Sequence, residues 1–220
     1  MSTELGAVDF GRLGPAEGFR VAVTGGCGGI GRNLVRTCLD IGLEVAVIDL
    51  KDSLHRHPVP DGVLAIEFDA RTDDGTQQAF DHLANQWNGE LDGLVHLPGY
   101  MARYAPVDEL SIAEIDEALS VNLRSAFLAA RAALPLMRKA GQGGMVFAAS
   151  GLATLVEKGT ATYSAAKAGI IALAKGLAKE NAPEIRANCI APGAVDTAFL
   201  RGGTGRGGDD VDPADQQLVK

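Results

Sequence analysis

The sequence predicts one α/β domain in which helices cover both faces of a parallel sheet. Six short apolar segments alternate with helical patterns over residues 20–200. Most of these segments are apolar at every position, which is typical of strands buried on both faces. Because crossovers between parallel strands are right-handed, we expect a doubly wound sheet with the strand order 3-2-1-4-5-6.

Apolar and β-branched residues mark each strand, and glycine or charged residues separate it from the next element. The predicted strands are Arg20–Thr24, Glu44–Leu50, Val63–Asp69, Leu91–Leu97, Gly144–Ser150 and Arg186–Ile190. The intervals between them are long enough for crossover connections.

Four helices are predicted between the strands. The first carries an apolar stripe from Ile30 to Ile41 and stops at Gly42. The others are expected at Asp73–Trp87, Ser111–Lys139 and Thr162–Asn181. Ser111 and Glu114 form an S-x-x-E capping box at the start of the third helix. Pro135 is expected to bend that helix or to end it near residue 134.

The residues on either side of this domain carry no clear element pattern. Residues 1–19 form an N-terminal extension with acidic residues and no apolar run, which does not resemble a signal peptide. Residues 201–220 are rich in Gly and Asp without periodicity, and we expect a flexible tail there. The folded domain is therefore predicted at residues 20–200.

The composition disfavours several classes of function. Among 220 residues, 20 Lys and Arg stand against 28 Asp and Glu, and the resulting net charge of −8 opposes binding to nucleic acid or to an anionic membrane. Aromatic residues make up only 5%, which leaves few platforms for stacking bases. The sequence contains no run of about 18 apolar residues, so we expect no membrane span.

The three cysteines are widely spaced, at Cys27, Cys38 and Cys189. They form no C-x-x-C pair and no Cys/His ligand set, so we expect neither a disulfide framework nor a metal site. Unpaired thiols fit a reducing compartment, and the expected location is cytoplasmic.

A glycine-rich turn follows the first predicted strand, in the segment from Thr24 to Gly31 (TGGCGGIG). Glycines at Gly25, Gly29 and Gly31 let the backbone turn sharply and approach a pyrophosphate. The helix that follows presents its N–H groups and its positive dipole end to the phosphates. A tight structural turn is the alternative, but the position between a strand and a helix favours dinucleotide binding.

Two acidic residues at strand ends are candidates for contacts to the adenosine part of such a ligand. Asp49 lies 18 residues after Gly31, where a carboxylate accepts both ribose hydroxyls and repels a 2′-phosphate. Lys51 could soften that repulsion, yet NAD is favoured over NADP as the cofactor. Asp69 ends the third strand, where it either contacts the adenine amino group or caps a helix or a turn.

The catalytic candidates are Tyr163 and Lys167, which form Y-S-A-A-K. Their i, i+4 spacing places both side chains on one face of a helix. The ammonium is expected to lower the pKa of the tyrosine, which could then exchange a proton with an alcohol or carbonyl oxygen. Ser150 ends the fifth predicted strand, at the sheet edge where open α/β sheets bind ligands.

With these motifs in order, the sequence resembles the short-chain dehydrogenase/reductase family, in the Rossmann-like single-domain branch with T-G-x-x-x-G-x-G and Y-x-x-x-K motifs. The match runs from about Arg20 to Phe199. The matching residues are Thr24, Gly25, Gly29 and Gly31 in the glycine loop, then Asn122, Ser150, Tyr163 and Lys167, and finally Pro192, Gly193 and Thr197.

The resemblance implies a role for each of these residues. Tyr163 would be the general acid/base, and Lys167 would lower its pKa and bind the nicotinamide ribose. Ser150 would hold the substrate oxygen, and Asn122 would anchor a water that links Lys167 to solvent. The resemblance also assigns cofactor contacts to Ile30, Gly99, Ile190, Pro192, Gly193, Val195 and Thr197.

Two features depart from the family pattern. The family's N-N-A-G after the fourth strand is replaced by His96-Leu97-Pro98-Gly99. His96 either substitutes as a hydrogen-bond donor or has a purely structural role, and Pro98 removes a backbone donor. The lid and the seventh strand, which normally follow the Pro192-Gly193 segment, have no counterpart in the pattern here. We therefore expect the sixth strand to have an exposed edge.

Six residues that follow the fourth, fifth and sixth strands are expected to face the substrate. They are Tyr100, Met101, Arg103, Leu152, Ala153 and Ala194, and they suggest a mixed, mostly apolar pocket. Arg103 is either a contact for an anionic group or a solvated loop residue.

The leading hypothesis is an NAD-dependent oxidoreductase acting on a secondary alcohol or ketone. The alternative is a non-catalytic nucleotide-binding or interaction protein of the same fold. The resemblance also implies a homodimer or homotetramer formed through the helices at 111–139 and 162–181.

Overall fold

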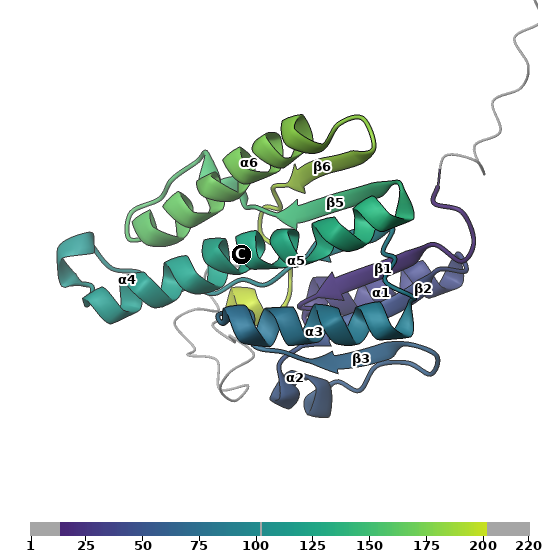
Figure 1. Ribbon diagram of the computed structural model, residues 1–220. Coiled ribbons are helices and arrows are strands. Elements are labelled where there is room, and N and C mark those ends of the chain that lie inside the picture. Colours follow the sequence, from purple (N-terminus) through teal and green to yellow (C-terminus); the bar gives the residue numbers. More distant parts are fainter. Residues whose placement is uncertain (1–13, 102, 202–220) are drawn as a thin grey trace, which may run out of the picture.

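The computed structural model describes residues 14–101 and 103–201, and the predicted tail therefore lies almost entirely outside the described residues. Within them, six parallel strands form one sheet with the order β3-β2-β1-β4-β5-β6, which confirms the predicted topology. The strands are β1 (Arg20–Thr24), β2 (Glu44–Asp49), β3 (Leu64–Glu67), β4 (Gly93–His96), β5 (Gly143–Ala148) and β6 (Ile185–Ile190). All the arrowheads in Figure 1 point to the same edge of the sheet, so the carboxyl ends of the strands meet there.

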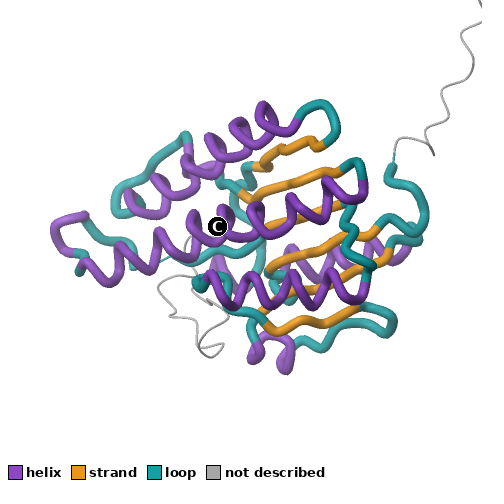
Figure 2. Tube along the Cα trace, in the orientation of Figure 1, coloured by secondary structure: helices purple, strands orange, loops and turns teal. Residues whose placement is uncertain are grey.

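Helices lie on both faces of this sheet, as Figures 1 and 2 show. Helices α3 (Asp73–Gln86), α5 (Ser125–Ala140) and α6 (Ala161–Asn181) cover one face, and α1 (Gly29–Asp40) covers the other. Two shorter helices, α2 (Lys51–Arg56) and α4 (Ile112–Leu119), complete the set. Helix α2 was not predicted from the sequence, because its six residues are too few to give a helical pattern.

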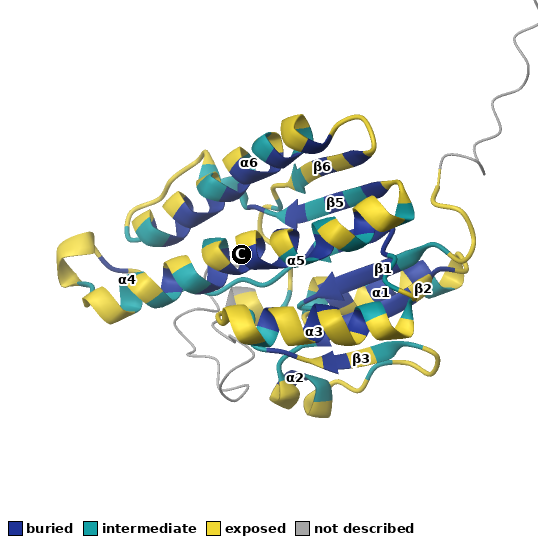
Figure 3. Cartoon of the chain, viewed as in Figure 1, coloured by how far each residue is buried: buried dark blue, intermediate teal, exposed yellow. Residues whose placement is uncertain are grey.

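The strands have two buried faces because successive side chains point to opposite sides. In β1 and β2, Ala22, Ala46 and Ile48 pack with the helices α3, α5 and α6, while Val23 and Val47 belong to the separate core beneath α1. Figure 3 shows the result, with buried strands between helices whose outer surfaces are exposed. This arrangement explains why the strand sequences are apolar at nearly every position.

The long helix predicted at Ser111–Lys139 is continuous but not uniform. It consists of α4, a π-helical turn at Ser120–Arg124 and α5, and the capping box at Ser111 is present. Pro135 lies inside α5 and does not end the helix, because α5 continues to Ala140. The expectation of a stop near residue 134 was therefore wrong, since Ala133 and Met137 are fully buried on either side of the proline and hold the helix against the sheet.

Strand β6 is the last strand of the sheet in the part of the chain that is described. Its residues alternate, with Ile185 and Ala187 buried and Arg186 and Asn188 exposed. Among residues 14–101 and 103–201, no helix is both long and apolar enough to cross a membrane.

Candidate active site

Tyr163 and Lys167 lie in the first turns of α6, at the carboxyl edge of the sheet. Both side chains are buried, with residual exposures of 7% and 2%. The Nζ atom of Lys167 lies 5.7 Å from the centroid of the Tyr163 ring. The i, i+4 spacing has thus placed both groups on one helix face, as predicted.

The ammonium of Lys167 is held by backbone carbonyls. Nζ donates to Ala148 O at 2.9 Å, at the end of β5, and to Pro98 O at 3.3 Å, just after β4. Burial lowers the pKa of Lys167 to about 8, because the charged form loses hydration. The group therefore still carries a proton through most of the neutral range.

Ser150 lies directly beyond β5, where its Oγ accepts a hydrogen bond from Leu152 N at 3.2 Å. Burial raises the pKa of Tyr163, and the negative charge of a Tyr104 phenolate would raise it further, whereas a hydrogen bond with the Ser150 side chain lowers it. The net direction is opposite to the lowering expected from the spacing of Tyr163 and Lys167, because loss of hydration is the largest of these effects.

Asn122 lies in the π-helical turn and is fully buried. Its Nδ2 donates to Tyr100 O at 2.6 Å and to Ala118 O at 2.8 Å, and its Oδ1 accepts from Tyr100 N at 2.9 Å. The side chain therefore fastens the loop after β4 to the helix from which it projects. No pattern in the sequence indicated these two hydrogen bonds between Asn122 and the backbone of Tyr100.

The glycine loop packs closely against the start of α1. A Cβ atom at Gly31 would lie 2.6 Å from the carbonyl oxygens of Gly25 and Gly26, so only glycine fits where α1 starts against the loop. Gly28 is the extended N-cap of α1, which has no side-chain cap and no acidic residue in its first turn. No acidic side chain of the first turn of α1 competes for the N–H groups there, and the residues fit a dinucleotide phosphate.

Asp49 ends β2 beside this loop. Its Oδ2 accepts from Cys27 N at 2.9 Å and its Oδ1 from Leu50 N at 2.8 Å. The carboxylate is thus held at the junction of β2 and the glycine loop, which is the position predicted for a contact to the adenosine ribose.

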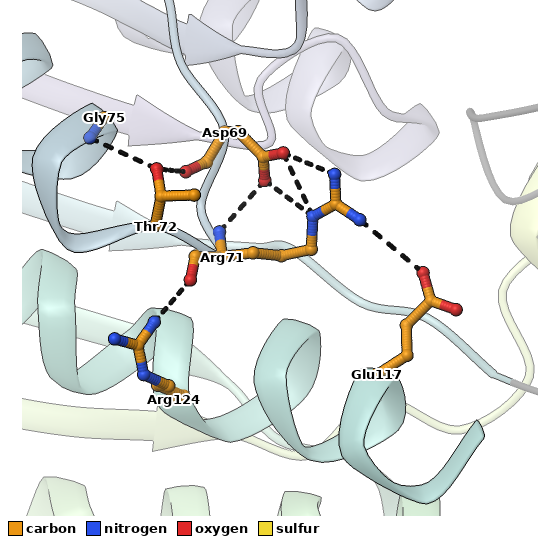
Figure 4. Close-up of polar contacts among 6 residues, drawn as sticks. All are labelled: Asp69, Arg71, Thr72, Gly75, Glu117 and Arg124. Atoms are coloured by element: carbon orange, nitrogen blue, oxygen red, sulfur yellow. Dashed lines mark hydrogen bonds and ion pairs between the residues drawn. The ribbon is translucent and has the colours of Figure 1, made fainter. Parts of the chain in front are cut away.

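Asp69 is engaged by a neighbouring arginine, as Figure 4 shows. Arg71 donates from its backbone N to Oδ1 at 3.0 Å, and its guanidinium binds both carboxylate oxygens. The guanidinium also lies 3.8 Å from Glu117 of α4, and Arg124 donates to the carbonyl of Arg71. The hydrogen bond from Arg71 N to Asp69 fits the expected turn cap. A helix cap at Asp69 is not formed, because the N-cap of α3 is Thr72.

The segment after β6 contacts both the glycine loop and the residues around Tyr163. Pro192 O accepts a hydrogen bond from Gly151 N at 2.8 Å, and a Cβ atom at Gly29 would lie 2.5 Å from the Thr197 side chain. The ring of Phe199 lies 6.1 Å from that of Tyr163, centroid to centroid. Phe199 is a neighbour of the site that the sequence marked only as the end of the family match.

Gly99 lies where four segments of the site converge. A Cβ atom there would be 3.6 Å from Phe199, 3.7 Å from Lys167 Nζ and 3.8 Å from Asn122 Oδ1. The predicted cofactor residues Val195 and Ile190 are partly exposed, and the space around Gly193 is open.

The expected substrate residues lie on the segments that follow β4, β5 and β6, with Leu152 and Ala153 in a short 3₁₀ helix. Among them, the side chain of Arg103 is bound to residues before and within α4. Its Nε donates to Glu114 Oε1 at 3.1 Å, and its guanidinium also donates to the carbonyl of Glu109. Of the two interpretations, the structure favours a loop arginine held by the start of α4. The described residues contain no cluster of His, Cys, Asp and Glu that could hold a metal ion.

Comparison with known proteins agrees with this geometry. The sequence model of the short chain dehydrogenase family matches residues 20–204. Cis-1,2-dihydrobenzene-1,2-diol dehydrogenase of Pseudomonas putida is 34% identical over 193 residues, which cover 84% of this chain and 70% of that protein.

Solved structures give the same result. Levodione reductase is 26% identical, with a TM-score of 0.82 over 93% of this chain and 83% of that one. The 3-ketoacyl-(acyl-carrier-protein) reductase of Brucella melitensis, solved with NADH, has a TM-score of 0.80 at 24% identity over 86% of this chain and 80% of that one, and it supports the fold.

Replacing Lys167 by Met is expected to stabilise the protein at neutral pH. The pKa of Lys167 falls from 10.5 to about 8 on folding, so burial of its charge costs up to about 3 kcal/mol at pH 7. Since the unfolded chain binds more protons between pH 8 and 10.5, the wild-type protein gains stability through that window and the advantage of Lys167→Met shrinks.

Urea unfolding of both proteins at pH 7, 8.5 and 10 measures this difference. Lys175→Met, at an exposed position of the same helix, is the control and should change the unfolding free energy little at any pH. A Lys167→Met protein less stable than wild type at pH 7, or a pH-independent difference, would contradict the expectation.

Proposed function

The chain belongs to the short-chain dehydrogenase family, and from this premise we propose that it transfers a hydride between a nicotinamide dinucleotide and a secondary alcohol or ketone. The observation that carries the proposal is the convergence of Ser150, Tyr163 and Lys167 at the carboxyl edge of a doubly wound sheet. The dehydrogenase and reductase names of the relatives support this reaction class. Residues 20–200 form the proposed catalytic unit.

We propose that residues of this chain contact both the adenosine end and the nicotinamide end of such a cofactor. The proposed contacts are Thr24, Gly25, Gly29, Ile30, Gly31, Asp49, Asp69, Gly99, Tyr163, Lys167, Pro192, Gly193, Val195 and Thr197. When bound, the nicotinamide ring supplies or accepts the hydride. Lys167 has two N–H groups on carbonyls, which leaves its third for a ribose hydroxyl. Binding at Asp69 requires that Arg71 release at least one carboxylate oxygen.

In this proposal Tyr163 is the general acid/base. Its raised pKa keeps the phenol protonated at neutral pH, which is the state needed to give a proton to a ketone oxygen. The Ser150 hydroxyl lies within reach of the phenol and holds the same substrate oxygen. Proton return from solvent would pass by Lys167, with Asn122 fixing the loop beside it.

We propose NAD as the preferred cofactor because of Asp49. A carboxylate held beside the glycine loop accepts ribose hydroxyls and repels a 2′-phosphate. Lys51, two residues on, is exposed and offers partial compensation.

We also propose that two copies of the chain associate through α5 and α6. A groove between these helices is lined by Leu123, Phe127, Leu134 and Leu173, among others. Phe127 is 52% exposed, which is unfavourable for a large aromatic side chain in water. The free cysteines Cys27, Cys38 and Cys189 support a reducing location such as the cytoplasm.

Replacing Tyr163 by Phe is expected to lower turnover by at least about 100-fold, because the proton donor is lost. Dinucleotide affinity should change by less than about threefold, since the ring and its packing remain. Steady-state rates with cyclic diols and secondary alcohols, together with calorimetric titration of NADH, separate the two effects. Normal turnover in Tyr163→Phe would refute the assigned chemistry, and NADH binding without any turnover in wild type would favour the non-catalytic alternative.

Replacing Asp49 by Asn is expected to reduce the preference for NAD over NADP by at least about tenfold, because the repulsion of a 2′-phosphate disappears. The amide keeps one oxygen for Cys27 N, so the loop should retain its shape. Dissociation constants for both cofactors measure the ratio, and Asp52→Asn on the exposed side of α2 is the control. A wild-type preference for NADP would contradict the proposal.

Replacing Phe127 by Glu is expected to convert the proposed dimer to a monomer, because a carboxylate would be buried in an apolar interface. Light scattering at micromolar concentration measures the mass, and the control is Arg36→Glu at an exposed position of α1, on the opposite face of the sheet. A monomeric wild-type protein would refute the proposed association.

A further inference from the structure

His96 is a buried polar residue that the proposed reaction leaves without a role. It ends β4 and is 2% exposed. Its Nδ1 lies 2.8 Å from Thr24 Oγ1 and its Nε2 lies 3.0 Å from Ser125 Oγ. Both partner residues are fully buried. Thr24 and His96 are also paired positions of the parallel strands β1 and β4, so their contact follows from the sheet register.

The direction of these hydrogen bonds can be assigned from the partners. The Ser125 hydroxyl donates its single proton to Val121 O at 2.6 Å. It must therefore accept from His96, which places a proton on Nε2 and leaves Nδ1 to accept from the Thr24 hydroxyl. Burial and the nearby charge of Lys167 lower the pKa of His96 to about 3, so the ring is neutral and this tautomer is consistent.

The result is one directional chain of hydrogen bonds, from Thr24 through His96 and Ser125 to the carbonyl of Val121. Its first member is the last residue of β1, directly before the glycine loop. Its far end lies in the π-helical turn, where Val121 precedes Asn122. This hydrogen-bond chain ends on the carbonyl of Val121, which accepts a hydrogen bond but has no proton to pass on, so the chain cannot serve as a proton relay.

We propose that His96 is a positioning residue that fixes the glycine loop at one end and the turn carrying Asn122 at the other. The proposal rests on the proposed function, because it assigns cofactor binding to the first end and turnover to the second. Asn122 in turn holds Tyr100 beside Gly99 and Lys167. A shift of the π-helical turn would therefore move the loop against which Lys167 is bound.

Two amide substitutions test the Thr24 end and the Ser125 end of the hydrogen-bond chain separately. In His96→Asn, the short side chain can present its oxygen to Thr24 but cannot reach Ser125. In His96→Gln, the longer side chain can donate to Ser125 but no longer accepts from Thr24. A residue that merely fills space in the core would make the two variants alike in their functional effects.

We expect His96→Asn to lower kcat about fivefold or more and to change the Kd of NADH by less than about twofold, because only the Ser125 end is lost. We expect His96→Gln to raise the Kd of NADH about fivefold or more and to change kcat less than His96→Asn does. Ser125→Ala should reproduce the Asn variant and should add little to it in the double variant. His55→Asn and His55→Gln, at an exposed histidine, are the matched controls.

Equal changes in kcat and Kd for the Asn and Gln variants would overturn the proposal, as would additive effects of His96→Asn and Ser125→Ala. If the His96 variants do not fold, Ser125→Ala and an NMR measurement on wild type remain. Nitrogen chemical shifts of the labelled histidine ring should give the Nε2–H tautomer, and the Nδ1–H tautomer would contradict the assignment. A wild-type protein that binds no dinucleotide would instead refute the proposed function, while the tautomer would still test the hydrogen-bond chain.

Discussion

The buried ammonium of Lys167 is the constraint on which the arrangement of the site depends. A cation loses hydration when it enters the protein, and here two backbone carbonyls replace the water rather than a carboxylate. Carbonyls that no neighbouring strand engages are found where parallel strands end and the chain turns away. The rotation and depth of α6 are thereby fixed relative to the ends of β4 and β5, and Tyr163, one turn earlier, is fixed with it.

The same burial explains the electrostatics of the site. Tyr163 and Lys167 both lose water, and each is shifted toward its neutral form, so the pKa of the phenol rises and that of the amine falls. A tyrosine in these surroundings holds its proton, and the hydrogen bond with the Ser150 side chain only partly offsets the effect of burial on its pKa. The site thus stores its proton on the phenol, next to a lysine whose charge costs little to remove just above neutral pH.

The sequence was sufficient for the parts of the structure that depend on local pattern. The strand order followed from apolar segments and the handedness of crossovers, and Tyr163 and Lys167 shared a face because helical spacing dictates it. What the sequence could not predict depends on long-range contacts. The sign of the Tyr163 pKa shift depends on burial by distant segments, and the capture of Asp69 by Arg71 depends on the path of one loop. Pro135 predicted a break because the cost of a proline inside a helix follows from the sequence alone. The burial of its neighbours Ala133 and Met137, which outweighs that cost, does not follow from the sequence.

The π-helical turn between α4 and α5 illustrates why such features lie at functional sites. A π-helical turn is rare and occurs mostly as a single turn inside an α-helix. Here side chains support the turn, since Ser125 bonds the carbonyl of Val121 and Asn122 bonds the carbonyl of Ala118. Both side chains also reach outward, Ser125 to His96 on β4 and Asn122 to Tyr100 beyond it. These contacts tie the geometry of the turn to the end of β4 and, through Gly99, to Lys167.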